Sequence, residues 1–230
     1  KANNLSLLKS KGFNVPHGWV ITTNFFAKVS GKEHLGIWQE IEKSLHLEKN
    51  KRYAVRSSAS VEDHLDHSFA GQFDTFLNIK REFVGEKVLA VIKNTYSKQV
   101  ATYIKAKGLN KSIKMAVIIQ EMVDADKAGV VFGKDLQTSD DDKVILDVAR
   151  GLGEGVVDGT AKTQRITYLK NKNQIINDQN DPEKLILDKI EITSLIGMAF
   201  SVEKMMGKTQ DIEWAIDKQG TIWLVQSRDL

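Results

Sequence analysis

The sequence predicts an α+β protein with two lobes, residues 1–112 and 113–230, that meet near Lys111 to Lys114. Long segments in both halves carry apolar residues at the spacing of amphipathic helices. Short runs of β-branched residues between turn signals predict strands, and these runs are densest in the second half. A chain of 230 residues that is 41% hydrophobic is long enough to bury a substantial core in such a fold.

The first lobe is expected to begin with a loop around Pro16 and a short strand at Trp19 to Thr22, where β-branched residues cluster. A helix is expected at residues 33–47, because Ile37 and Ile41 start a stripe of apolar residues at four-residue spacing. The remaining elements of this lobe are strands at 53–55 and 73–79 and one long helix over 82–107.

The second lobe is expected to be dominated by a sheet. The run from Met115 to Met122 predicts a largely buried strand, because most of its residues are apolar. A helical stretch opened by Pro182 and a terminal β-hairpin follow, with Lys218 to Gly220 as the connection of the hairpin. The strands of this lobe are expected at 115–122, 129–132, 144–148, 212–216 and 222–226.

The composition excludes several classes of function. The absence of cysteine rules out disulfides, thiol nucleophiles and Cys-ligated metals, so a metal site would use oxygen or imidazole ligands, which suit Mg²⁺ or Mn²⁺. The 33 basic and 30 acidic residues are too balanced to indicate a nucleic-acid or membrane partner. No apolar run approaches the roughly 18 residues of a membrane helix. The start of the sequence lacks a signal-peptide pattern, so we expect a cytoplasmic protein.

Two segments of the first lobe carry residues suited to phosphate. Tyr53 to Ala59 places the guanidinium of Arg56 directly after a strand and before two serines, a combination that suits phosphate oxygens. Ser68 to Gln72 contains Gly71, which lets backbone amides approach an anion closely. Each pattern alone is also typical of an ordinary surface loop.

The terminal hairpin gathers four polar side chains. Asp211 and Glu213 are two residues apart on one strand and therefore face the same side. The hairpin brings Gln226 and Arg228, again two residues apart, onto the partner strand. Two carboxylates with a carbonyl suit magnesium bridged to phosphates, and the arginine can compensate charge on a transferring phosphoryl group. The alternative interpretation is a set of surface salt bridges across a hairpin.

The segment from Tyr53 to Ile79, YAVRSSASVEDHLDHSFAGQFDTFLNI, resembles the signature of the N-terminal ATP-binding domain shared by phosphoenolpyruvate synthase, pyruvate phosphate dikinase and rifampicin phosphotransferase. The resemblance continues in the family order over almost the entire chain. It implies an ATP-grasp-like fold in which two lobes hold the nucleotide. The further matching blocks are Ile119 to Val123, Ala128 to Phe132, Gly151 to Glu154, Asp211 to Trp214 and Leu224 to Arg228.

This resemblance implies phosphate-contacting and catalytic roles for three basic residues. Lys1, with Asn4 and Leu5, matches the end of a Gly-Gly-Lys-x-x-Asn-Leu motif whose lysine reaches the ATP phosphates. Arg56 matches an arginine that also contacts phosphate. Arg228 is implied to lie at the metal and phosphate end of the site and to act there with the other two.

The resemblance also implies the rest of the site. The loop around Gly71 and Gln72 looks like a lid over the triphosphate of ATP, which is the expected substrate. The segment Gln120-Glu121-Met122-Val123 corresponds to a strand and linker whose backbone groups hydrogen-bond adenine. Mg²⁺, or Mn²⁺, is implied at the phosphate end. Its expected protein ligands are Asp211, Glu213 and Gln226.

Some segments depart from the family or resemble other motifs. Phe132-Gly-Lys-Asp135 stands where relatives usually have Phe-Thr-x-Asp, and Gln164 stands at the place of a common aspartate. Gly207-Lys-Thr209 resembles the tail of a P-loop, but Val202 occupies the position of the required glycine, so we expect a helix-terminating turn. Gly151 to Gly155 lacks the dinucleotide-binding spacing and predicts a tight turn.

Two functions remain open. The first is the nucleotide half-reaction module of a pyruvate, water dikinase-like phosphotransferase, which binds Mg–ATP and phosphorylates a histidine on a separate domain, in cis or in trans. None of the five histidines lies in the Thr-Ser-Gly-type context of the family's phosphoacceptor. The second is a non-catalytic or degenerate ATP-binding module. Retention of the whole phosphate end favours the first, because adenine binding alone would not need it; its residues are Lys1, Arg56, Asp211, Glu213, Gln226 and Arg228. The resemblance does not name the final acceptor, whether pyruvate, an antibiotic or another molecule.

Overall fold

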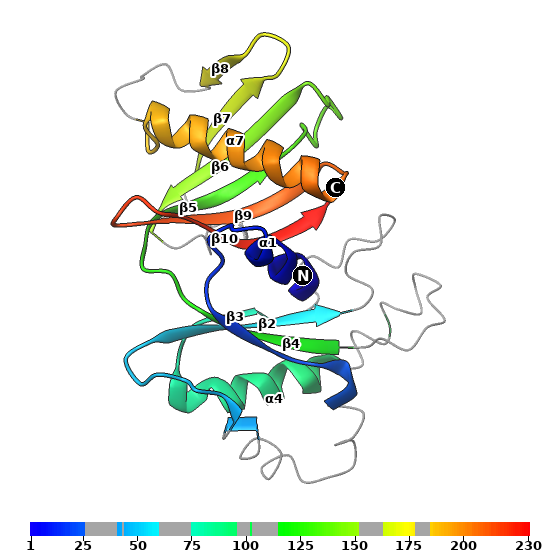
Figure 1. Cartoon of the computed structure of the whole chain (residues 1–230), viewed down its shortest axis with the longest axis vertical. Helices are drawn as coiled ribbons and strands as arrows, with labels where there is room; N and C mark the ends of the chain where they lie inside the picture. The colour runs from blue at the N-terminus through cyan, green and yellow to red at the C-terminus, as the bar shows by residue number, and fades with distance from the viewer. Residues whose placement is uncertain are drawn as a thin grey trace. The chain divides into compact units, whose positions relative to one another are not determined.

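The computed structural model describes residues 1–25, 41–42, 44–59, 75–95, 102, 115–151, 163–177 and 185–230. These residues form two compact units (Figure 1). The N-terminal unit comprises His17 to Met122 together with Ala2, and the C-terminal unit comprises Lys1, residues 3–16 and residues 123–230. Both units combine antiparallel strands with helices, which confirms the predicted α+β class.

The N-terminal unit contains a four-stranded antiparallel sheet in the order β1-β4-β2-β3, and helix α4 packs against the sheet (Figure 1). The core between them includes Tyr53, Val55, Val88, Val117 and Ile119, each at most 1% exposed. The elements are β1 (Gly18–Ile21), β2 (Arg52–Ala59), β3 (Thr75–Lys80), the 3₁₀ turn η1 (Arg81–Phe83), α4 (Val84–Thr95) and β4 (Met115–Glu121).

Strand β4 decides where the units divide. It pairs antiparallel with both β1 and β2, so it lies inside the sheet of the N-terminal unit. The units therefore divide between Met122 and Val123, whereas the sequence pattern alone assigns residues 115–122 to the second lobe. Residues 3–16, expected in the first lobe, pack with the C-terminal unit. A local apolar pattern predicts a strand but does not specify which strands it pairs with. It likewise does not show which unit the N-terminal segment packs with.

Strand β2 is longer than the sequence pattern predicts. The expected strand at 53–55 is present, but the segment from Arg56 to Ser58 continues it and pairs with Ala116 to Ile118 of β4. Arg56 therefore lies within the strand and not directly after it, where the sequence pattern placed it. Helix α4 forms the first part of the helix expected over 82–107, while most of its second part, like most of 33–47, lies outside the described residues.

The C-terminal unit contains a six-stranded antiparallel sheet in the order β10-β9-β5-β6-β7-β8, and helix α7 lies across one face of it (Figure 1). Val131, Leu146, Ile166 and Trp214 of the sheet form a common core with Leu195 of α7. Strands β7 and β8 were not expected from the sequence. The strands are β5 (Ala125–Phe132), β6 (Lys143–Arg150), β7 (Gln164–Leu169), β8 (Gln174–Asn177), β9 (Gln210–Asp217) and β10 (Ile222–Asp229).

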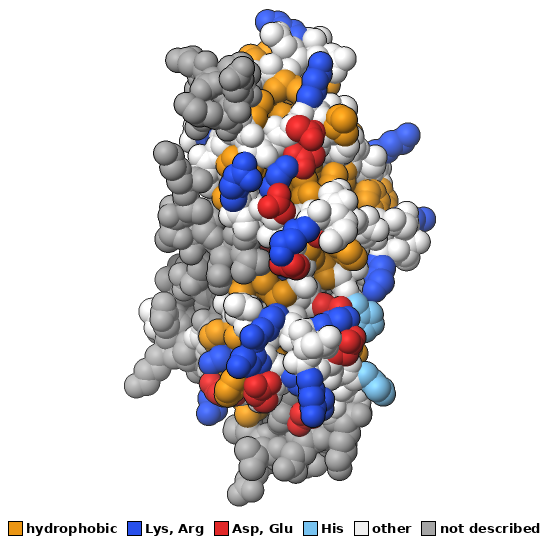
Figure 2. Space-filling view, turned by 90° about the vertical axis from the view of Figure 1, so that its left-hand side faces the viewer, with side chains coloured by type: hydrophobic (Ala, Val, Ile, Leu, Met, Phe, Trp, Pro, Cys, Tyr) orange, Lys and Arg blue, Asp and Glu red, His pale blue; other side chains and the backbone are white. Residues whose placement is uncertain are grey.

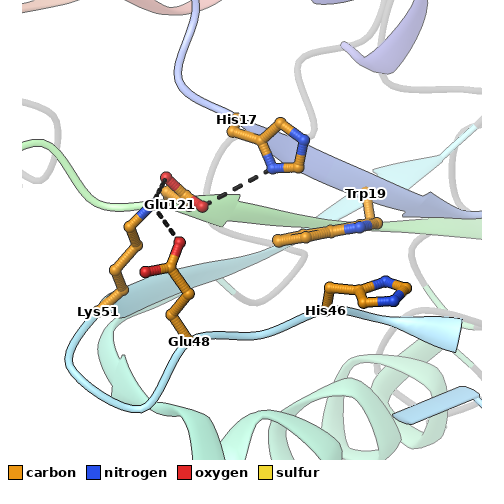
Figure 3. Close-up of a pocket in the computed structure, with 6 residues that line it drawn as sticks. All are labelled: His17, Trp19, His46, Glu48, Lys51 and Glu121. Carbon is orange, nitrogen blue, oxygen red and sulfur yellow. Dashed lines mark hydrogen bonds and ion pairs between the residues drawn. The ribbon is translucent and has the colours of Figure 1, made fainter. Parts of the chain in front are cut away.

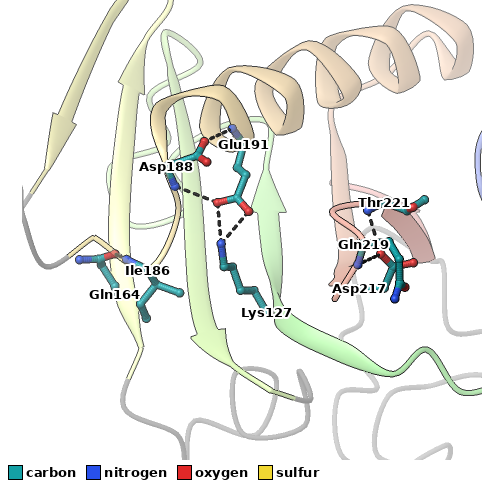
Figure 4. Close-up of polar contacts among 8 residues, drawn as sticks. All are labelled: Lys127, Gln164, Ile186, Asp188, Glu191, Asp217, Gln219 and Thr221. Atoms are coloured by element: carbon teal, nitrogen blue, oxygen red, sulfur yellow. Dashed lines mark hydrogen bonds and ion pairs between the residues drawn. The ribbon is translucent and has the colours of Figure 1, made fainter.

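Helix α7 (Lys189–Met206) is defined by signals at both ends. Asp188 accepts from the Glu191 amide, and the Glu191 carboxylate accepts from the Asp188 amide, each over 2.8 Å, in a capping box (Figure 4). Lys127 of β5 donates to the same Glu191 carboxylate over 2.6 Å. Gly207 ends the helix with a φ of 72°, so the predicted helix-terminating turn is confirmed. Pro182, expected to open this helix, lies outside the described residues.

The predicted terminal hairpin is confirmed. Strands β9 and β10 pair antiparallel, and the backbone amides of Gln219 and Thr221 donate to the Asp217 carboxylate over 3.0 and 2.9 Å (Figure 4). Gly220 has a φ of 80°, a conformation that favours glycine, and it completes the turn. A carboxylate that accepts two turn amides fixes the direction in which β10 returns.

The N-terminal segment lies along the outer edge of β10. Helix α1 (Ala2–Ser10) contributes Leu8 to the core of the C-terminal unit. The Asn4 side chain donates to the Ser227 carbonyl over 2.9 Å, and the Asn14 side chain donates to the Ile222 carbonyl over 3.2 Å. Polar groups that an edge strand would otherwise expose are thereby satisfied. No pattern in the sequence predicts this helix or its two anchors.

Charges of both signs are mixed on the molecular surface. On the face shown in Figure 2, Lys and Arg side chains are interspersed with Asp and Glu side chains and with apolar groups. This distribution agrees with the formal net charge of only +3. No helix in the described part of the chain is long and apolar enough to cross a lipid bilayer.

Candidate functional site

A β-bulge in β10 places the polar residues of the hairpin on one face of the sheet. Leu224 pairs with Trp214, but Gln226 pairs with Glu213, so Val225 is an extra residue opposite the neighbouring strand. Because side chains alternate along a strand, an unbulged strand would point Gln226 toward the same side as the core residue Leu224. The bulge reverses this direction and turns Gln226 away from the core.

Two polar pairs form on that face, between β9 and β10. The Gln226 amide donates to the Glu213 carboxylate over 2.9 Å. The Arg228 guanidinium donates from Nε to the Asp211 carboxylate over 2.6 Å and forms an ion pair with it. The Asp211 side chain is only 5% exposed, whereas that of Arg228 is 41% exposed. All four hairpin residues singled out from the sequence are therefore brought together, in the predicted cross-strand arrangement.

Burial raises the pKa of the Asp211 carboxyl. Desolvation raises the pKa of the Asp211 carboxyl above its ordinary value of 3.8, and the neighbouring Glu213 carboxylate raises this pKa further. The charge and hydrogen bond of Arg228 act in the opposite direction and lower it, without cancelling the effect of burial. A buried carboxylate with a raised pKa gains from any further positive charge that is placed beside it.

The same face continues across the sheet. In the strand register, Glu213 lies opposite Val130, Val130 opposite Asp147, and Asp147 opposite Arg165. The Arg165 guanidinium donates two hydrogen bonds of 2.8 Å to the Asp147 carboxylate. This second acid–guanidinium pair was not expected from the sequence. Its signal is a single aspartate within the apolar run VILDVA of β6, which marks the side of β6 that faces away from the core.

The donor set of the hairpin fits a hard divalent cation. Asp211 and Glu213 offer carboxylate oxygens, and Gln226 offers an amide carbonyl. Among the described residues, no group of three or more His, Asp or Glu side chains is arranged to hold a metal on its own. Mg²⁺ in phosphate-transfer sites uses one or two carboxylates and completes its shell with water and phosphate oxygens. Two carboxylates and an amide therefore suit a cation that arrives with a phosphorylated ligand.

Lys1 belongs to the same unit as the hairpin. It caps the N-terminus of α1, where the Leu5 amide donates to the Lys1 carbonyl over 3.1 Å. Asn4, in the first turn of that helix, is bound to the carbonyl of Ser227, the residue between Gln226 and Arg228. The structure thus places the backbone of the N-terminal lysine motif beside the polar end of β10.

Arg56 and Gln120 lie together in the N-terminal unit. They occupy neighbouring strands β2 and β4, where Arg56 pairs with Ile118 and Gln120 pairs with Ala54. Both alternate with core residues that face α4, so both side chains belong to the opposite face of the sheet. Arg56 is 9% exposed and Gln120 is 3% exposed. Two of the predicted nucleotide-contacting residues therefore share one buried face.

The expected adenine-binding segment begins at the end of β4. The Glu121 amide donates to the His17 carbonyl over 2.8 Å, and the Met122 amide donates to the Arg52 carbonyl over 2.9 Å. These two amides already donate hydrogen bonds within the N-terminal unit. An adenine base that hydrogen-bonds to the backbone of Gln120 to Val123 would therefore use other groups of that segment.

The Glu121 side chain points into an open cavity of about 510 Å³ (Figure 3). Lys51 donates to the Glu121 carboxylate over 2.9 Å and bridges it to Glu48 over 2.8 Å. The hydrogen bonds to Glu48 and Glu121 raise the pKa of the Lys51 ammonium, and the bond to Glu48 contributes more. The Trp19 ring lies in the same cavity, with the His17 ring edge-on to it at 4.6 Å. Glu121 belongs to the α4 side of the sheet, opposite to Gln120, so its carboxylate is engaged away from the Arg56 face.

Other predicted positions have separate outcomes. Gly71 and Gln72, the expected lid, lie outside the described residues. Gly151 has a φ of 78°, in keeping with a turn at that residue, while residues 152–155 lie outside the described part. Gln164 is 3% exposed, and its side-chain carbonyl accepts a hydrogen bond from the Ile186 backbone amide over 2.8 Å (Figure 4). The residue at the place of the family's aspartate thus holds the segment before α7.

Carboxylate and amide oxygens beside a guanidinium, on the sheet of an α+β chain, suit a phosphorylated ligand. The sequence comparison identifies a nucleotide-binding domain. The family described as "Pyruvate phosphate dikinase, AMP/ATP-binding domain" matches residues 31–187 and 177–230, and the chain belongs to this family.

Several curated relatives match most of the chain. "Prodigiosin synthesizing transferase PigC" of Serratia marcescens is 34% identical over 201 residues, covering 77% of this chain and 22% of the relative. "Probable phosphoenolpyruvate synthase" of Methanocaldococcus jannaschii is 32% identical over 204 residues, covering 77% of this chain and 17% of the relative. "Phosphoenolpyruvate synthase" of Helicobacter pylori is 31% identical over 233 residues, covering 83% of this chain and 29% of the relative. The chain therefore spans less than a third of the length of each of these relatives.

Solved structures give weaker likenesses. The L-amino acid ligase from Bacillus licheniformis superimposes with a TM-score of 0.49 at 12% identity, covering 99% of this chain and 42% of that one. The VanG D-Ala:D-Ser ligase from Enterococcus faecalis gives a TM-score of 0.47 at 11% identity, covering 99% and 51%. The resemblance to the family implies an ATP-grasp-like fold, and the two α+β units of the chain agree with that expectation.

Proposed function

We propose that this chain binds ATP with Mg²⁺, or Mn²⁺, and donates a phosphoryl group to a histidine on a separate domain or chain. It is then the nucleotide half-reaction module of a pyruvate, water dikinase-like phosphotransferase. The observation that carries this proposal is the pairing of Glu213 with Gln226 and of Asp211 with Arg228 on one sheet face. Family membership supplies ATP as the ligand.

The proposed roles divide between metal binding and charge compensation. Asp211, Glu213 and Gln226 hold the cation through oxygen atoms, and the bound cation neutralises charge on the triphosphate. Arg228, whose side chain is 41% exposed beside a 5% exposed carboxylate, stabilises charge on the transferring phosphoryl group. Lys1 and Arg56 contact the phosphates, and the backbone of Gln120 to Val123 contacts adenine.

The proposed transfer step uses a histidine of a separate domain or chain as its acceptor. An imidazole nitrogen of the acceptor forms a bond to phosphorus while the bond from phosphorus to the bridging oxygen of the nucleotide breaks, and the nucleotide leaves with that electron pair. Relatives named for different products, a phosphoenolpyruvate synthase and a prodigiosin synthesizing transferase, each match most of this chain. What the chain shares with both is therefore expected to be the nucleotide half-reaction and not the final acceptor.

The decisive experiment uses ATP labelled in the β- and γ-phosphates, with a histidine-bearing domain of the family added as acceptor. Label that becomes bound to histidine only when the chain, the metal and the acceptor domain are all present would support the proposal. The labelled position that is transferred shows which bond of ATP is broken. The isolated chain is expected to turn over little ATP, because a closed site without acceptor excludes water.

The alternative is a non-catalytic or degenerate ATP-binding module. It is favoured by the changed positions Gly133 and Gln164, the second of which serves the local structure by holding the Ile186 amide. On this view the chain binds Mg–ATP, but no label reaches any histidine. Retention of the buried Asp211 carboxylate in an ion pair with Arg228 argues against it, since adenine binding alone does not require a desolvated carboxylate.

A further inference from the structure

Two asparagines of the N-terminal segment donate to the backbone of β10. Asn4 binds the Ser227 carbonyl over 2.9 Å, and Asn14 binds the Ile222 carbonyl over 3.2 Å. Strand β10 is an edge strand of its sheet, so both bonds lie along that edge. They differ in position, because Ile222 begins the strand, whereas Ser227 lies between Gln226 and Arg228. Only the Asn4 bond is adjacent to the polar pairs of the hairpin.

The Asn4 bond also sets the start of α1. Lys1 caps this helix, and the Leu5 amide donates to the Lys1 carbonyl, so Lys1 and Asn4 belong to the same first turn. With a rise of about 1.5 Å per residue, the two residues lie roughly 4–5 Å apart along the helix axis. An anchor at Asn4 therefore fixes the backbone of Lys1 to within a short distance of the residues that flank Ser227.

The apolar contacts of α1 do not by themselves determine this position. Leu5 and Leu8, 7% and 0% exposed, hold the helix against the core of the C-terminal unit. Apolar contact is non-directional and tolerates small sliding of a helix over the surface that it covers. A hydrogen bond of 2.9 Å from a side-chain amide to one carbonyl is directional, and it selects one position along β10.

We propose that Asn4 is a positioning residue, which holds Lys1 in register with Gln226 and Arg228. The inference rests on the proposed function, because it requires that Lys1 contacts the phosphates of bound ATP. Asn4 does not itself touch the nucleotide. It acts by fixing the first turn of α1 on the strand that carries the phosphate end of the site. Its contribution to ATP binding is therefore expressed through Lys1.

The experiment is a double-mutant cycle on the whole chain, read by calorimetric titration with Mg–ATP. Lys1→Met and Asn4→Ala are each expected to weaken binding, by about tenfold for Asn4→Ala, as when one charge-assisted contact is loosened. The double variant should bind no more weakly than Lys1→Met alone, because Asn4 acts through Lys1. Asn14→Ala removes the matching bond to Ile222 and should leave affinity within about twofold of wild type, since a local bond far from the site adds little.

Several outcomes would overturn the inference. The first is an unchanged Mg–ATP affinity in Asn4→Ala. The second is a double variant whose loss of affinity equals the sum of the losses in Asn4→Ala and Lys1→Met. The third is a loss of affinity in Asn14→Ala as large as that in Asn4→Ala. Asn4→Asp, which keeps the size of the side chain but loses the donor, provides a second variant if Asn4→Ala unfolds.

Amide exchange tests the anchor without ATP. Asn4→Ala should speed exchange of the Leu5 amide, which closes the first turn of α1, while Asn14→Ala should not. An unchanged Leu5 exchange rate would refute the anchor itself. Failure of the wild-type chain to bind Mg–ATP would instead refute the proposed function, and the exchange result would still decide whether Asn4 positions Lys1.

Discussion

Gln226 lies opposite Glu213 across the terminal hairpin, and its side-chain amide donates to the Glu213 carboxylate over 2.9 Å. The pairing depends on the bulge at Val225, which turns Gln226 and Arg228 away from the side occupied by Leu224. One backbone irregularity thus allows a single strand to contribute both to an apolar core and to a polar site. The metal-binding chemistry proposed for the hairpin depends on that irregularity.

Deletion of Val225 should therefore destroy the site and destabilise the fold. Without the extra residue, either Gln226 and Arg228 turn into the core or Leu224 and its neighbours turn out of it. Burying an unpaired guanidinium costs several kcal/mol, and exposing a buried leucine costs about 1.5–3 kcal/mol. Thermal and denaturant unfolding would measure the loss. Val225→Ala, which keeps the extra residue, should retain the fold, and a fully stable deletion variant would contradict this account of the bulge.

Glu213→Gln should uncouple nucleotide binding from the metal. The substitution keeps the size of the side chain but removes the negative charge that draws the cation, so Mg²⁺ should no longer increase ATP affinity. Calorimetric titration with ATP, with Mg²⁺ and with a chelator, measures the difference. The control is Asp124→Asn in the same unit, which removes the charge from a carboxylate that is 82% exposed. A metal effect as large in Glu213→Gln as in wild type would exclude Glu213 from the ligand set.

The raised pKa of Asp211 predicts a pH dependence of stability. Between the ordinary value of 3.8 and the raised value, the folded chain retains a proton that the unfolded chain has released. Ionisation of Asp211 therefore lowers the free energy of unfolding as pH rises through that window. Asp211→Asn, which cannot ionise, should lack this loss, so the variant should gain stability relative to wild type as pH rises. Denaturant unfolding at several pH values measures the difference.

Metal binding at Asp211 should have the opposite dependence. Only the ionised carboxylate binds a hard cation, so Mg²⁺ affinity should fall as pH decreases through the raised pKa. The midpoint of this fall should lie above 3.8, the ordinary pKa of an aspartate. A stability difference between wild type and Asp211→Asn that does not vary with pH would show that burial does not perturb this acid.

The hairpin of the C-terminal unit and its strands β5, β6, β9 and β10 were predictable because their signals are local. The apolar runs in β5 and β6 and the glycine of the hairpin connection each specify structure within a few residues. The turn at Gly207 was predictable for the same reason, since only the local backbone must adopt a positive φ. Asp211 and Glu213 could likewise be assigned to one face from the two-residue period of a strand.

The features that the sequence did not reveal are non-local. The partners of β4 lie in segments that begin at Gly18 and Arg52, far from it in the chain, so its pattern could not show which lobe it joins. The Asn4 anchor connects residues separated by 223 positions. Arg56 was expected directly after the strand at 53–55, but pairing with β4 extends that strand through Arg56. The bulge at Val225 has no composition signal, because valine is an ordinary strand residue.

The close approach of β5 and β6 should make Gly129 intolerant of any side chain. A methyl group at Gly129 would overlap the Asp147 carbonyl oxygen and lie 2.7 Å from the Trp214 ring. Neither neighbour can yield easily, because one is backbone of the adjacent strand and the other is a core side chain that is 1% exposed. Gly129→Ala should therefore cost at least about 1–3 kcal/mol, the usual range for overpacking. Because Val130 lies opposite both Glu213 and Asp147, the strand shift should also weaken Mg–ATP binding.

Gly197 provides the matched control within the same unit. It lies in α7, where an added methyl group would meet no atom within 4 Å. Gly197→Ala should therefore stabilise the helix by about 0.8–1 kcal/mol, because alanine loses less backbone entropy than glycine in a helix. Denaturant unfolding of the two variants should give shifts of opposite sign from the same chemical change. If Gly129→Ala were as stable as Gly197→Ala, the strands β5 and β6 could not be as close as the structure places them.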